Sequence, residues 1–217
     1  MRNLGLSMQA SIRFHFQIKK LKICLVLLGI IIKMANERII LGIDPGTTIM
    51  GFGLIKVVNK QMIFLQLNEL QLSKYDDHYK KLKVIFERTI ELIDTHLPDE
   101  IAIEAPFFGK NVQSMLKLGR AQGVAMAAGL SRQIPITEYE PKKIKMAITG
   151  NGNASKEQVA KMLQQLLGLK ELPKNLDSTD GLAAAVCHFF NSGKVIGEKN
   201  YSGWDAFVKD NEKRVKK

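Results

Sequence analysis

The sequence has little cysteine and little histidine. It contains two cysteines, Cys24 and Cys187, and four histidines among 217 residues. Two cysteines cannot build the framework of several disulfides that holds a small secreted domain together. The chain also offers no Cys/His cluster suited to zinc. We therefore expect a reducing, cytoplasmic environment and, for any bound metal, oxygen ligands.

The sequence also lacks a membrane span near its start. The apolar stretch at residues 23–32 follows Lys19, Lys20 and Lys22, but it is shorter than the roughly 20 residues that cross a bilayer. No small-residue cleavage site follows it, so a signal peptide is not indicated. We interpret residues 1–33 as a basic-apolar leader, from a misassigned start upstream of Met34 or a disordered segment, and expect no membrane contact.

Internal repeats and low-complexity tracts are absent as well, and the length of 217 residues favours one domain with short appendages. Residues 1–33 contribute +6 to the net charge of +11 and contain no acid, which leaves +5 for the rest. A moderately basic domain favours polyanionic partners such as DNA. We expect the domain to span residues 34–192 and residues 193–217 to form a basic tail.

The hydrophobic pattern predicts a mixed α/β fold. Strands are expected at residues 38–44, 50–57, 61–67, 100–104 and 134–138, and helices at 79–93, 111–129 and 176–190, with a partly helical segment at 142–150. A further helix begins at the capping box of Ser155 and Gln158 and stops at Gly168. Three strands in a meander, followed by alternating helices and strands, predict a five-stranded mixed sheet with helices on both faces, which is the element order of the ribonuclease H-like fold.

Four acids carry the chemical signal. Asp44 and Glu104 each end a short apolar strand, and Asp177 and Asp180 lie three residues apart near the start of the last helix. A buried carboxylate is costly unless it is paired or holds a cation, and carboxylates suit hard ions such as Mg²⁺ or Mn²⁺. For the pair Asp177 and Asp180, a second interpretation stays open, in which both only stabilise the helix N-terminus and Asp177 is the N-cap.

The turn at residues 42–48 allows another reading, because sugar kinases, actin and Hsp70 chaperones open with a similar ATP-binding turn. Those proteins need a second lobe with its own Asp-x-Gly turn, and this chain supplies none. A basic DNA-architectural protein without an active site is the nonenzymatic alternative. The four acids argue against it.

Longer motifs resemble the RuvC family of crossover junction endodeoxyribonucleases, the Holliday junction resolvases, over residues 38–192. The motifs stand at residues 40–46, 103–104, 110–111, 116–125 and 177–183. The resemblance implies that Asp44, Glu104, Asp177 and Asp180 are catalytic and hold two Mg²⁺ ions per subunit, for which Mn²⁺ would substitute. It further implies a homodimer that nicks a four-way junction symmetrically, leaves 5′ phosphates and works with the RuvA and RuvB branch-migration proteins. Ser178, Thr179 and Gly181 depart from the usual residues, and we expect them only to loosen the helix slightly.

The resemblance also indicates DNA-contacting residues. Phe107 is expected to stack on bases at an opened junction, with Phe108 as a core residue, and the basic side chains expected on DNA are those of Lys110, Arg120, Lys145 and Lys156. Lys156 opposes the dipole of its helix, which suggests a phosphate contact, although a solvated lysine offset by Glu157 is the alternative. Cys187 and His188 are expected to be packing residues.

A stripe of small residues, Gly119, Gly123 and Ala127, recurs at intervals of four. Such a stripe permits close helix approach, either to the domain's own sheet or to a second subunit. The resemblance favours a two-fold dimer contact.

Overall fold

The chain folds around one five-stranded sheet in the order β3-β2-β1-β4-β5. The structure, a computed structural model, describes residues 37–106, 111–171, 173 and 176–192. Strands β1 (Glu37–Asp44), β2 (Ile49–Val58) and β3 (Gln61–Gln71) form the antiparallel meander, and β4 (Glu100–Glu104) and β5 (Ile136–Tyr139) extend the sheet parallel to β1. The predicted mixed sheet is confirmed.

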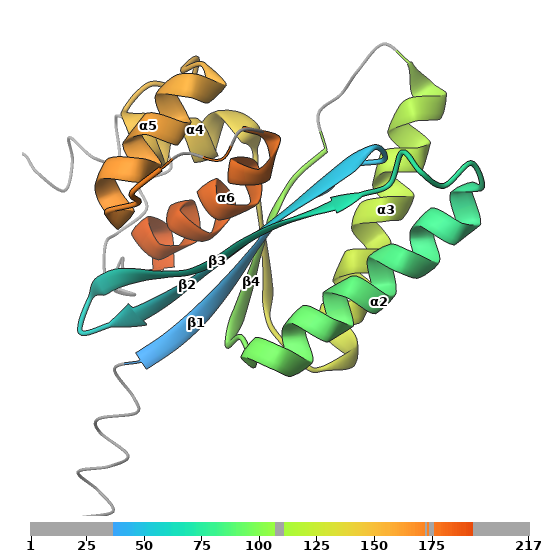
Figure 1. Cartoon of the computed structure of the whole chain (residues 1–217), viewed down its shortest axis with the longest axis horizontal. Coiled ribbons are helices and arrows are strands. Elements are labelled where there is room, and N and C mark those ends of the chain that lie inside the picture. Colours follow the sequence, from blue (N-terminus) through green and yellow to red (C-terminus); the bar gives the residue numbers. More distant parts are fainter. Residues whose placement is uncertain (1–36, 107–110, 172, 174–175, 193–217) are drawn as a thin grey trace, which may run out of the picture.

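Helices cover both faces of this sheet (Figure 1). Helices α2 (His78–His96) and α3 (Val112–Ser131) pack on one face, and α4 (Pro141–Thr149), α5 (Lys156–Leu167) and α6 (Asp177–Ser192) lie on the other. Alternating side chains of β1 explain the two layers, because Ile40 joins the core under α6 whereas Leu41 and Ile43 join the core under α2 and α3. None of the helices within the described residues is long and apolar enough to cross a membrane.

Local signals set most element ends. Asn59 and Lys60 both have positive φ, which gives the β2–β3 hairpin the two-residue turn that matches strand twist. The capping box of Ser155 and Gln158 starts α5, and Gly168 ends it with φ 63°. Helix α2 ends before Pro98 because Leu97 adopts the left-handed conformation and donates its N–H to the Ile93 carbonyl. The segment expected to be partly helical is a regular helix, α4.

Helix α6 lies unusually close to strands β1 and β2. A Cβ added to Gly42 would lie 2.0 Å from the carbonyl oxygen of Gly181, and one added to Gly53 would lie 2.3 Å from the Cα of Leu182. A Cβ on Gly181 would in turn lie 2.6 Å from the Gly51 carbonyl oxygen. The missing side chain of Gly181 lets α6 approach the sheet, a packing role that the expectation of a slightly loosened helix did not include.

The small-residue stripe on α3 faces away from the sheet. Added Cβ atoms at Gly119 and Gly123 would meet no described atom within 4 Å, and both glycines and Ala127 are exposed. Packing of this stripe on the domain's own sheet is therefore excluded. Gly129, one turn further on, is the glycine of α3 that touches the sheet, at Ile101 and Ile136.

Candidate active site

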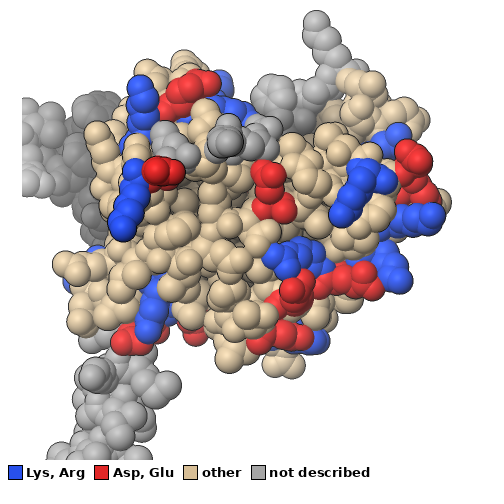
Figure 2. Space-filling model, in the orientation of Figure 1, with Lys and Arg blue, Asp and Glu red and all other residues tan. Residues whose placement is uncertain are grey.

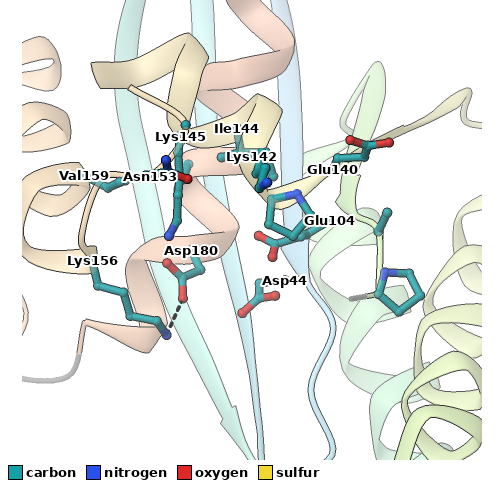
Figure 3. Close-up of a pocket in the computed structure, with 15 residues that line it drawn as sticks. Asp44, Glu104, Glu140, Lys142, Ile144, Lys145, Asn153, Lys156, Val159 and Asp180 are labelled. Atoms are coloured by element: carbon teal, nitrogen blue, oxygen red, sulfur yellow. Dashed lines mark hydrogen bonds and ion pairs between the residues drawn. The ribbon is translucent and has the colours of Figure 1, made fainter. Parts of the chain in front are cut away.

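The topology brings acids from separate parts of the chain to one edge of the sheet. Strands β1 and β4 are parallel neighbours, with Ile43 paired to Ile103, so the next residues, Asp44 and Glu104, emerge side by side. Asp180 comes from the first turn of α6, which packs over the same strands. Figure 3 shows the three carboxyl groups pointing toward a common space.

That space is a cavity of about 800 Å³. It is lined by the acids Asp44, Glu104, Glu140 and Asp180, by the lysines Lys142, Lys145 and Lys156, and by Ala105, Pro106, Pro141, Ile144, Gly152, Asn153, Val159 and Ala183. Acids and lysines share its walls, with Asp180 beside Lys145 and Lys156 and with the Asp44 and Glu104 carboxyl groups facing them (Figure 3). A cavity with both charges on its walls can hold cations at its carboxylates and a phosphate at its lysines.

Glu104 has the most perturbed carboxyl group of the site. Its pKa is raised from 4.5 to about 7, mainly by burial and also by the nearby Asp180 carboxylate, while Lys156 and Lys145 oppose the shift. The shift shows that the existing lysines do not offset the desolvation and repulsion that an ionised Glu104 experiences. A cation bound beside Glu104 would favour its ionised form.

Asp180 forms an ion pair with Lys156. The Lys156 Nζ lies 2.8 Å from Asp180 Oδ2, with the lysine side chain 50% exposed and the aspartate side chain 19% exposed. The capping box fixes the base of Lys156, since the Gln158 N–H donates to the Ser155 hydroxyl and the Ser155 N–H donates to the Gln158 side chain. The ion pair thus links the starts of α5 and α6 across the cavity.

The other predicted residues are placed as follows. Lys145 lines the cavity from α4, whereas Arg120 is exposed on α3 and lines a different hollow with Val112, Met115, Leu116 and Gly119. Asp177 is the first residue of α6, and its side chain lies outside the described residues, as do Phe107, Phe108 and Lys110. The sequence did not point to Glu140, which also lines the cavity. It directly follows the parallel strand β5, whereas Asp44 is the last residue of β1.

His188 and Cys187 are packing residues, as predicted. The two ring nitrogens of His188 lie 2.9 Å from the Tyr139 hydroxyl and 2.9 Å from a Glu100 carboxylate oxygen. Burial lowers the pKa of His188 and raises the pKa of the Cys187 thiol to about 11. A neutral imidazole with a hydrogen-bond partner at each ring nitrogen, and a protonated thiol, are both suited to the core.

The donor set of the cavity fits a hard divalent cation in its chemistry, because Asp44, Glu104 and Asp180 offer only carboxylate oxygens. Among the residues that the structure describes, however, no three acidic, histidine or cysteine side chains stand close enough to hold one ion together. The Asp177 side chain, which lies outside the described residues, is the remaining member of the predicted ligand set.

Comparison with known proteins gives the same family throughout. The family described as crossover junction endodeoxyribonuclease RuvC matches residues 40–188. The crossover junction endodeoxyribonuclease RuvC of Christiangramia forsetii is 80% identical over 183 residues, which cover 84% of this chain and 95% of that protein. The protein of the same description from Bacteroides fragilis is 60% identical over 187 residues, covering 85% and 100%.

Solved structures agree. Thermus thermophilus RuvC is 32% identical with a TM-score of 0.65, over 71% of this chain and 95% of that one. The structure of T. thermophilus RuvC in complex with a Holliday junction substrate is 31% identical with a TM-score of 0.67, over 71% and 94%. These matches confirm the expected ribonuclease H-like fold. With the acid-lined cavity at the carboxyl edge of β1 and β4, they show that this chain belongs to the RuvC family of crossover junction endodeoxyribonucleases.

Proposed function

We propose that this chain resolves Holliday junctions by hydrolysing one phosphodiester bond in each of two opposed strands, in DNA recombination and repair. The observation that carries the proposal is the single cavity that Asp44, Glu104 and Asp180 line together with lysines of α4 and α5. The family relationship gives the substrate class, because relatives are named for crossover junctions and one was solved with a Holliday junction.

The lysines and the acids have different roles toward a phosphodiester. Lys142, Lys145 and Lys156 line the cavity, where their charges attract a DNA phosphate and hold it near the carboxylates. Asp44, Glu104 and Asp180, together with Asp177, would hold two Mg²⁺ or Mn²⁺ ions. When bound, such ions supply Lewis acidity that activates the attacking water and stabilises the leaving 3′ oxygen, which yields 5′ phosphate ends.

A homodimer completes the proposal. The exposed stripe of Gly119, Gly123 and Ala127 allows the α3 helices of two subunits to approach each other closely. An isologous dimer presents two identical sites to the two symmetry-related strands of a junction. We further propose that residues 34–192 form the nuclease domain, that the protein acts in the cytoplasm, and that it receives junctions from RuvA and RuvB.

The direct test incubates the full-length protein with a synthetic four-way junction and with a duplex of matched sequence. We expect paired nicks in the junction with Mg²⁺ or Mn²⁺, little cutting of the duplex, and no cutting in EDTA. Ca²⁺, which tolerates looser geometry, should support binding with little cleavage. Equal cutting of junction and duplex would remove the proposed selectivity, and cleavage that survives EDTA would exclude the metal-dependent reaction.

A further inference from the structure

The ion pair between Lys156 and Asp180 places a cation where the proposed metal site needs a free carboxylate. The Lys156 Nζ lies 2.8 Å from Asp180 Oδ2, and Asp180 is the less exposed of the two. Lys156 belongs to α5 and Asp180 to α6, so the contact is tertiary and does not arise from neighbouring positions on one helix. Figure 3 shows the pair at the wall of the cavity, with the Asp44 and Glu104 carboxyl groups facing it.

The anchoring of Lys156 makes this contact specific. Its backbone is fixed at the first position of α5 by the capping box, and Val159, Ala160 and Leu163 bury the inner face of that helix. A cation at a helix N-terminus is unfavourable with respect to the helix dipole. The attraction of Asp180 offsets this, so Lys156 is held at the cavity by the acid and not by its own helix.

The other acids of the cavity are not gathered around the pair. Asp44 and Glu104 line the same cavity as Lys156 and Asp180, yet within the part of the chain that the structure describes, no three potential ligands converge on one point. The Lys156 ammonium thus occupies one carboxylate of the predicted ligand set without assembling the other acids.

We propose that Lys156 is the resident cation of the metal-free site and that metal binding transfers Asp180 from Lys156 to the ion. This inference rests on the proposed metal-dependent function. The exchange releases the Lys156 ammonium into the cavity, where its flexible stem can reach a DNA phosphate. Lys156 is therefore a positioning residue. A metal ion takes Asp180 away from Lys156, and a DNA phosphate takes Lys156 away from Asp180. Each ligand thus breaks the ion pair, so the binding of one favours the binding of the other.

The first test measures Mn²⁺ binding to the full-length protein by calorimetry, without DNA. Lys156→Met should tighten the binding of the first ion about fivefold, which corresponds to about 1 kcal/mol. Lys156→Arg keeps the pair and should bind Mn²⁺ like the wild type. Lys161→Met, one turn further along α5 and exposed, controls for net charge and helix stability, and we expect its affinity to stay within about twofold of the wild type.

Lys145→Met provides the sharper control, because Lys145 lines the same cavity and acts on Glu104 through space. A general effect of positive charge would make Lys145→Met and Lys156→Met equal. The proposed exchange requires the larger gain in Lys156→Met. Equal gains, or no gain in Lys156→Met together with unaltered thermal stability, would overturn the inference, as would a lack of Mn²⁺ binding in wild type and variant alike.

A spectroscopic readout follows the ammonium group itself. In protein labelled at lysine, the Lys156 side-chain resonance should move toward that of a solvated lysine as Mg²⁺ is added, and Asp180→Asn should move it in the same direction without Mg²⁺. A Lys156 resonance that stays unchanged at saturating Mg²⁺ would contradict the exchange. Neither experiment requires turnover, so a wild-type protein that shows the exchange but leaves junctions uncut would refute the proposed function and leave this inference standing.

Discussion

At the scale of single residues, the surroundings of Glu104 disfavour the ionised form of its carboxyl group. Its folded pKa of about 7 exceeds its ordinary value of 4.5, so the native state retains this proton over a pH range in which the unfolded chain has lost it. Stability therefore falls as pH rises from about 4.5 to about 7 and levels off above that range. The loss is at most about 3 kcal/mol, by the conversion of about 1.4 kcal/mol per pKa unit.

We predict that Glu104→Gln removes this dependence in the metal-free protein. Glutamine mimics the protonated acid, so the variant should match the wild type near pH 4 and exceed it in stability at pH 8. Denaturant unfolding in EDTA across this range measures the difference. If the free energies of unfolding of the two proteins change with pH in the same way, the pKa of Glu104 is not raised as described.

Asp44 should separate chemistry from binding. Asp44→Asn removes a carboxylate from the predicted ligand set, and we expect cleavage to fall below detection while junction binding persists or tightens, because negative charge near the phosphate is reduced. Gel shift and nicking assays run in parallel measure both. Glu140→Gln is the matched control, since it also neutralises an acid of the cavity; wild-type nicking by Asp44→Asn would remove this residue from the catalytic set.

Phe107 is expected to determine junction selectivity. It follows Pro106, which lines the cavity, and stacking of an aromatic ring on an unpaired base contributes about 1 to 3 kcal/mol. Phe107→Ala should reduce junction cleavage about tenfold or more, at about 1.4 kcal/mol per decade, with little change in melting temperature. Phe108→Ala should lower the melting temperature while the folded protein still cleaves junctions. If Phe107→Ala lowers the melting temperature and Phe108→Ala lowers cleavage instead, the two residues have the opposite roles.

At the scale of elements, the approach of α6 to the sheet depends on glycines. Gly53→Ala would force a Cβ to within 2.3 Å of the Leu182 backbone, and such overpacking typically costs about 1 to 3 kcal/mol. Because α6 also carries Asp180, cleavage should fall with stability. At Gly119, an added Cβ meets no described atom within 4 Å, so Gly119→Ala should instead raise the stability of the subunit by up to about 1 kcal/mol. Thermal unfolding compares the two variants. A similar change in stability for both would contradict the close approach of α6 to the sheet.

Most elements could be predicted from local patterns, and the exceptions have a common cause. The strand ends at Asp44 and Glu104 follow from apolar runs that stop at an acid, and the rule for parallel strands brings those acids together. The same rule applied to the expected fifth strand, residues 134–138, would have selected Glu138; the observed strand β5 ends at Tyr139, and Glu140 follows it. The role of Gly181 could not be predicted, because the backbone that it contacts belongs to β2, far away in the sequence. The ion pair of Lys156 with Asp180 is equally a tertiary contact.

At the scale of the whole molecule, charge is distributed in a mixed pattern. On the face shown in Figure 2, Lys and Arg side chains are interspersed with Asp and Glu. The cavity likewise carries both signs of charge, with three lysines among its lining residues, and salt dependence of DNA binding should arise mainly from phosphate contacts of lysines.

The proposed dimer gives a prediction at this scale. Gly123→Gln places a long side chain on the exposed stripe of α3, so it should weaken self-association at least tenfold without lowering the stability of the subunit, and junctions should be nicked singly instead of in pairs. Sedimentation over a range of concentrations measures the association. Glu87→Gln, exposed on α2, is the control, and unchanged association of Gly123→Gln would exclude the α3 stripe as the contact.

Three acids of the predicted catalytic set that the structure describes, Asp44, Glu104 and Asp180, come from β1, β4 and α6, which lie near the start, middle and end of the folded domain. A chain that ends after β4 contains Asp44 and Glu104 but lacks Asp180 and the helix that carries it. The order of the elements along the chain therefore makes α6 the last part of the site to be synthesised. A protein that cuts DNA gains its cutting site only when the last helix of its domain has been made.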